Sequence, residues 1–68
     1  MFTINSKFKP KTTFRMRIGI TSFEVNPQSV MTIRALDKEH DKVYIEFDPC
    51  LGDWEDIYWV KHNFEAIT

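Results

Sequence analysis

The sequence contains few of the residues that reactive or membrane-embedded proteins need. Its 68 residues include one cysteine, Cys50, so no internal disulfide can form and a reducing compartment is the expected setting. Only two glycines, Gly19 and Gly52, are present, which excludes a glycine-rich phosphate-binding loop. No stretch approaches the roughly 20 apolar residues of a membrane span, and no basic-then-apolar signal pattern opens the chain. We therefore expect a cytoplasmic protein without membrane contacts.

Catalytic and metal-binding signatures are missing as well. His40 and His62 form no zinc-ligand spacing with Cys50, and His62 is the one base that could activate this thiol. Acidic residues gather between Asp48 and Asp56, but they lack the alternate spacing and the central glycine of a calcium-binding loop. We predict a non-enzymatic protein with no catalytic residues, no bound metal and no cofactor.

The chain does contain enough apolar and aromatic residues for one modest core. Hydrophobic residues make up 43% of the sequence and aromatic residues 15%, a composition that argues against disorder. A chain of this length buries roughly 60% of its unfolded surface. We expect a single domain over residues 1–68.

Charge is distributed unevenly along the chain, although the net charge is only −1. The first 36 residues have a balance of +5 and the remaining residues a balance of −6. A folded domain could therefore present one basic and one acidic side. The alternative is that the strands simply expose their charges to solvent.

Alternation of apolar and polar residues with a period of two predicts short strands. The clearest alternation is in Val43–Asp48, which we expect to be the central strand. A second strand is expected at Thr12–Ile20, with its alternating apolar residues, Ile20 included, on the core face. Gly19 within this strand suggests a bulge. Further strands are expected at Val30–Leu36, Ile57–Lys61 and Glu65–Thr68, with a short strand or a frayed end at Met1–Asn5.

Pairing of Val30–Leu36 with Val43–Asp48 across the intervening polar loop predicts a definite register, because a slip of one residue would mix the two faces. The expected core pairs are Ala35 with Val43, Ile33 with Ile45, and Met31 with Phe47. The expected outer pairs are Arg34 with Tyr44, as a cation–π contact, and Thr32 with Glu46.

Turn-forming residues and polar runs separate the expected strands. They predict a basic connection at Ser6–Lys11, a turn at Asn26–Ser29, an irregular loop at Pro49–Asp56 and a 3₁₀ turn at His62–Phe64. No segment shows helical periodicity over ten or more residues. The sequence therefore predicts an all-β fold, a small barrel of five to six short antiparallel strands with a 3₁₀ turn near the C-terminus.

This succession of elements resembles SH3-like barrels, especially the small stand-alone barrels encoded by bacteriophages. In such proteins a Trp-containing strand leads through a 3₁₀ turn into a Phe-Glu-x-Ile end, which corresponds here to Trp59 and Phe64–Ile67. The chain departs from eukaryotic SH3 domains, because Ala35-Leu36-Asp37 is not their Ala-Leu-Tyr-Asp-Tyr motif and their groove residues have no match. Lys9-Pro10-Lys11 also lacks the glycine of KOW-type nucleic-acid barrels.

Only the fold is carried over from this resemblance, and no binding residue is. What the resemblance implies is a barrel that binds proteins or nucleic acids and rarely catalyses reactions. It suggests a phage accessory protein or an inhibitor of a host protein, located in the host cytoplasm if it is phage-encoded. The sequence leaves open whether the chain is a monomer or a homodimer.

The leading candidate site is a partner-binding surface of acidic and aromatic residues. Trp54 lies among carboxylates and could anchor an interface, or it could equally cap one end of the barrel. An anionic surface of this kind would suit a basic protein partner. The predicted partner-binding residues are Asp53, Trp54, Glu55, Asp56 and Tyr58.

The alternative candidate is a nucleic-acid-binding face on the basic N-terminal half. Arg15 and Arg17 are expected to protrude from one face of a strand, Lys11 precedes them, and Arg34 would join them if its strand is a neighbour. Such a stripe could follow phosphates. The net charge of −1 weighs against it, because nucleic-acid-binding domains are usually basic.

Overall fold

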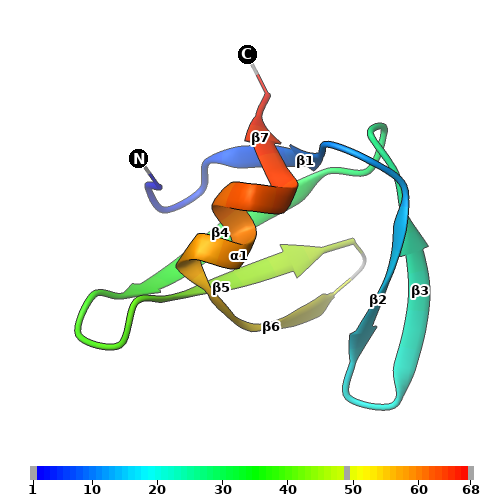
Figure 1. The fold of residues 1–68 in the computed structure, drawn as a ribbon. Coiled ribbons are helices and arrows are strands. Elements are labelled where there is room, and N and C mark those ends of the chain that lie inside the picture. The colour runs from blue at the N-terminus through cyan, green and yellow to red at the C-terminus, as the bar shows by residue number, and fades with distance from the viewer. Residues whose placement is uncertain (1, 49, 68) are drawn as a thin grey trace.

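The computed structural model describes residues 2–48 and 50–67, and over these residues the chain is predominantly β with one short helix (Figure 1). Five strands form an antiparallel sheet in the order β6-β5-β4-β1-β7, and β2 and β3 form a separate two-stranded hairpin. The elements are β1 Lys7–Pro10, β2 Phe14–Ile18, β3 Thr21–Val25, β4 Met31–Asp37, β5 Lys42–Phe47, β6 Leu51–Asp56, α1 Ile57–Asn63 and β7 Phe64–Ala66.

The alternating residues of β4 and β5 form the centre of the core, as the sequence predicts. Ile33, Val43 and Ile45 are fully buried, and burying an aliphatic side chain of this size contributes roughly 1.5–3 kcal/mol. Almost every other element adds at least one residue to the same cluster. These further buried residues are Phe2, Phe8, Met16, Val25, Met31, Phe47, Val60 and Phe64.

The predicted register between β4 and β5 holds for the first half of β4. The confirmed pairs are Met31 with Phe47, Thr32 with Glu46 and Ile33 with Ile45. They place the fully buried residues of both strands on the same face of the sheet, which is the reason for preferring this register over a slipped one.

Beyond Ile33 the register shifts by one residue, so two predicted pairs are wrong. Ala35 lies opposite Tyr44 rather than Val43, and Arg34 has no partner across the ladder. A bulge leaves one residue of the bulged strand unpaired and bends that strand. Arg34 consequently does not stack on Tyr44, and its Nε donates instead to Oε1 of Glu46 at 2.8 Å.

The β2–β3 hairpin keeps the predicted core face but ends earlier than the sequence suggests. Met16 is buried and Ile18 is half-buried, but Ile20 is 95% exposed and does not contribute to the core. Gly19 is not a bulge inside a strand. It lies in the hairpin turn with φ of +62°, a left-handed conformation that glycine adopts without a steric penalty. The turn therefore places Ile20 in solvent.

The N-terminal region also differs from the prediction. Residues 2–5 form no strand, whereas β1 occupies Lys7–Pro10, which the sequence suggested was a connection. Phe2 is nevertheless buried, and its ring lies 4.9 Å from that of Phe8. Phe8 joins the sheet on both sides, because it pairs with Met31 in β4 and with Ala66 in β7. Met1 lies outside the described residues.

Two predictions for the segment after Asp48 are wrong. The expected loop at Pro49–Asp56 contains strand β6, and the expected strand Ile57–Lys61 belongs to helix α1. The helix begins because the Asp56 carboxylate accepts hydrogen bonds from the backbone N–H groups of Tyr58, at 2.7 Å, and Trp59, at 3.2 Å. Lys61 and His62 in the last turn complement the helix dipole. Seven residues are too few to give a recognisable helical period.

The C-terminal strand lies slightly earlier than expected. It is Phe64–Ala66 rather than Glu65–Thr68. The predicted 3₁₀ turn at His62–Phe64 is wrong, because His62 and Asn63 end helix α1 and Phe64 begins β7. Phe64 is buried as predicted, whereas Ile67 is largely exposed. Thr68 lies outside the described residues.

The predicted all-β class is therefore confirmed, but hydrogen bonds do not close the sheet into a barrel. Within the described ranges, β6 and β7 are the two edges of the five-stranded sheet, and α1, orange in Figure 1, connects them. Counting the hairpin, these ranges contain seven strands rather than five or six. No helix in this part of the chain has the length and apolar character needed to cross a bilayer.

Stability should depend on the buried pair at the centre of β4 and β5. Replacing Ile45, which is fully buried, with alanine should lower the free energy of unfolding by about 2–5 kcal/mol, because a cavity remains. Ile20→Ala is the matched control, and its effect should stay within about 0.5 kcal/mol. Urea denaturation followed by tryptophan fluorescence measures both, and similar losses in the two variants would contradict this core assignment.

Candidate protein-binding surface

Strand β6 contains four of the five predicted partner-binding residues and places them at an edge of the sheet. It pairs with β5 on one side, and no strand of the described residues pairs with its other side. Trp54 lies opposite Tyr44 on the outer face, whereas Asp53 and Glu55 lie opposite the core residues Ile45 and Val43. Successive residues of β6 therefore present an aromatic ring to one side and carboxylates to the other.

The position of Trp54 argues against one of the two roles that the sequence left open, the capping of the core. Its side chain is 45% exposed and lies outside the core cluster, so Trp54 does not cap the core. It meets the ring of Tyr44 edge to face, with the ring centroids 5.5 Å apart. Such aromatic pairs contribute about 0.5–1.5 kcal/mol beyond their buried area. Trp54 is thus an exposed aromatic residue held in one orientation by its neighbour.

Gly52 makes this arrangement possible, because the Tyr44 ring lies directly over it. A β-carbon at Gly52 would be 2.6 Å from Cε1 of Tyr44 and 2.9 Å from the backbone oxygen of Ile45. Any larger residue would displace the ring that supports Trp54. The sequence pattern placed Gly52 in a loop and gave Tyr44 no role at this surface. Gly52 pairs with Glu46, two residues along β5 from Tyr44. A glycine so close to an aromatic residue on the adjacent strand is the sequence feature that could have indicated the contact between them.

Asp56 and Tyr58 continue the surface into the first turn of α1, but they have different roles. The Asp56 carboxylate is engaged as the helix cap, so its substitution would disturb the fold. Tyr58 is 62% exposed, and Nζ of Lys61 lies 5.6 Å from the centre of its ring. Tyr58 is therefore available to a partner, whereas Asp56 has a structural role.

The pKa of the Glu55 carboxyl group on this surface is raised. Partial burial raises the pKa of Glu55, repulsion from Asp53 raises it further, and the charge of Lys42 opposes both effects. Desolvation disfavours the charged form of a carboxyl group. At neutral pH, β6 therefore holds two neighbouring negative charges at some cost to the fold.

The residues of the alternative nucleic-acid-binding face, Lys11, Arg15 and Arg17, lie apart from Arg34. The four basic residues therefore do not form one continuous stripe. Arg15 and Arg17 are exposed on β2, where they donate to the Ser22 hydroxyl at 3.1 Å and to the Gly19 carbonyl at 3.2 Å. Lys11 donates to the Lys61 carbonyl at 3.3 Å. Arg34 is in β4, which is not a neighbour of β2, and it pairs with Glu46.

The remaining titratable residues form no cluster of the kind that binds a metal. In residues 2–48 and 50–67, no three His, Cys, Asp or Glu side chains lie close enough together to hold an ion. Cys50 is exposed. His40 hydrogen-bonds with the Asp37 carboxylate at 3.0 Å, and this contact lowers the pKa of Asp37.

Comparisons with family models, with curated proteins and with solved structures found no match to this chain. The candidate surface is therefore interpreted from its own geometry.

Replacing Glu55 with glutamine should increase stability at about pH 7, since the variant removes a carboxylate that the fold desolvates. Because the pKa of Glu55 is raised in the folded state, its protonated form favours folding below its ordinary range, and this contribution is lost as the pH rises through the folded pKa. The advantage of Glu55→Gln should thus shrink as the pH falls to about 3. Urea denaturation at both pH values measures it, and an advantage that does not change with pH would contradict the assigned desolvation.

Proposed function

We propose that this chain is a small, non-enzymatic protein-binding module that binds a basic, extended segment of a partner along β6. The observation that carries this function is Trp54, an exposed aromatic residue held by Tyr44 on an edge strand that also bears carboxylates. Exposed aromatic residues fixed by their neighbours are the usual anchors of protein interfaces.

The chemistry of the edge explains why a basic partner suits it. An unpaired strand edge offers backbone N–H and C=O groups to a further strand. Asp53 and Glu55 give this edge a negative charge. Two copies of β6 placed side by side would bring these carboxylates together, whereas lysine and arginine side chains would neutralise them. A heterologous basic segment therefore fits better than a second copy of the chain.

We also propose that the fold is an SH3-like barrel, as the sequence resemblance suggests. In support, the meander β4–β5–β6 shares one sheet with the first and last strands, and a short helix precedes the last strand. Sheets of this class display binding residues on their edges and loops. A phage accessory protein or an inhibitor of a host protein, acting in the host cytoplasm, is the setting that this resemblance suggests.

The double variant Trp54→Ala/Asp53→Lys should abolish the capture of protein partners while the fold survives. Trp54 supplies the anchor, and Asp53→Lys reverses the charge without touching the Asp56 helix cap. Immobilised native protein and the variant are compared as bait for lysate of the producing cells, with the captured proteins identified by mass spectrometry. Far-ultraviolet circular dichroism checks the fold of each bait.

The matched control is Ile20→Ala, which also removes an exposed apolar side chain but lies at the β2–β3 turn. It should capture the same proteins as the native chain. Retention of all partners by the double variant would overturn the site, and the absence of any protein partner would overturn the function. Binding of a labelled oligonucleotide that weakens steeply with salt and requires Arg15 and Arg17 would favour the nucleic-acid alternative.

A further inference from the structure

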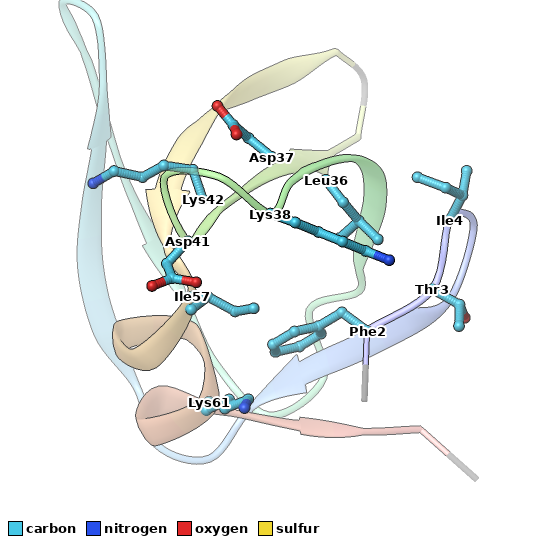
Figure 2. Close-up of a pocket in the computed structure, with 10 residues that line it drawn as sticks. All are labelled: Phe2, Thr3, Ile4, Leu36, Asp37, Lys38, Asp41, Lys42, Ile57 and Lys61. Atoms are coloured by element: carbon cyan, nitrogen blue, oxygen red, sulfur yellow. The ribbon is translucent and has the colours of Figure 1, made fainter.

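A groove of about 710 Å³ lies beyond the C-terminal end of β6, and Trp54 is not among its lining residues (Figure 2). It is formed by the N-terminal segment, the connection between β4 and β5, and the start of α1. Sites that take small organic ligands usually have volumes of roughly 300–1,000 Å³. The apolar side chains that line it are Phe2, Ile4, Leu36 and Ile57.

The walls of the groove are fixed by backbone hydrogen bonds between segments that are distant in sequence. The N–H of Ile57 donates to the carbonyl of Asp41 at 2.9 Å, which joins α1 to the β4–β5 connection. The N–H of Asn5 donates to the carbonyl of Ile33 at 2.7 Å, which joins the N-terminal segment to β4. The groove is therefore formed by the fold itself, and a ligand would not need to order these segments.

The floor is apolar and partly open to solvent. Phe2 is buried with its ring against Phe8, while Leu36 and Ile57 pack against the core from the side. Ile4, in contrast, is 50% exposed although it lines the groove. An apolar ligand seated here would cover surface that the protein leaves in water, and each buried CH₂ group would contribute about 0.8 kcal/mol.

The rim of this groove is positively charged on the side of Phe2. Figure 2 shows the side chains of Lys38 and Lys61 flanking the Phe2 ring, from the β4–β5 connection and from α1. In the part of the chain that the structure describes, no ion pair joins either lysine to a carboxylate. Asp37, also at the rim, is engaged with the ring and the backbone of His40. The Lys38 ammonium is thus available to an anion. Nζ of Lys61 lies 5.6 Å from the centre of the Tyr58 ring, and the Asp41 carboxylate also lines the groove, so an anion would gain most from Lys38.

We propose that this groove binds a small anionic amphiphile, a molecule with one carboxylate on an unbranched apolar chain. The chain would lie along Ile4, Leu36 and Ile57, and the carboxylate would accept a hydrogen bond from Lys38, while Lys61 on the other side of the Phe2 ring would add positive charge. Charge-assisted hydrogen bonds of this type are roughly twice as strong as neutral ones. A neutral molecule would gain only the apolar contacts, and a cationic one would be repelled.

Decanoate, below its critical micelle concentration, is the probe for the full chain. Isothermal titration calorimetry should show saturable one-to-one binding, and backbone amide shifts should change at Ile4, Leu36 and Ile57. Decanol should bind about tenfold more weakly, because it lacks the charge. Decyltrimethylammonium should not bind at this site.

Two sets of variants, each with a control on the β2–β3 hairpin, test the assigned residues. Lys38→Glu and Lys61→Glu should each weaken decanoate binding by about tenfold or more, whereas Arg17→Glu, an identical charge change on the β2–β3 hairpin, should leave it within about twofold. Ile4→Glu should abolish binding, whereas Ile20→Glu, at the hairpin turn, should not. Circular dichroism and thermal unfolding establish that each variant is folded.

Lack of saturable binding, equal affinity for decanoate and decanol, or equal losses in the groove and hairpin variants would each overturn the proposed ligand site. These outcomes are independent of the protein-binding function, since neither Trp54 nor Asp53 lines the groove.

Discussion

The pairing of β4 with β5 is the constraint on which the rest of this structure depends. Ile33 and Ile45 meet at its centre with no exposed surface, and the residues on either side of them bury their apolar face in the same way. The bulge that follows Ile33 leaves Arg34 unpaired on the outer side and brings Tyr44 opposite Ala35. On its other side β5 pairs regularly with β6, where Tyr44 lies opposite Trp54 and covers Gly52. The aromatic part of the candidate surface is thus built on the second ladder of the same central strand.

A second determinant is the change from strand to helix at Asp56. Its carboxylate satisfies two N–H groups that begin α1, and the helix then carries the chain from β6 to β7 at the other edge of the sheet. The same change positions Ile57 against the β4–β5 connection, where its N–H bonds to Asp41. The edge that bears Trp54 and the groove that Ile57 lines are therefore both consequences of one helix cap.

These two surfaces differ in the chemistry that they offer. The β6 edge combines carboxylates with an exposed tryptophan, the combination for which we propose an extended basic segment as partner. The groove combines apolar walls with the ammonium groups of Lys38 and Lys61, which suits an anion with an apolar body. In both proposals the ligand carries a charge opposite to that of the exposed protein groups and makes an apolar contact beside them. Either proposal can fail while the other stands.

The sequence alone determined the all-β class, the pairing of β4 with β5 as far as Ile33, and most of the core residues. It could do so because side chains alternate between the two faces of a strand and one face must be buried. It also named Trp54 and Tyr58 as candidate site residues, and both side chains are exposed. Only the tertiary structure decided that Ile57–Asn63 is helical, because a seven-residue helix depends on its cap and on burial of Val60 more than on periodicity. It alone brought Lys38 and Lys61 to one groove, because contacts between segments distant in sequence leave no local pattern.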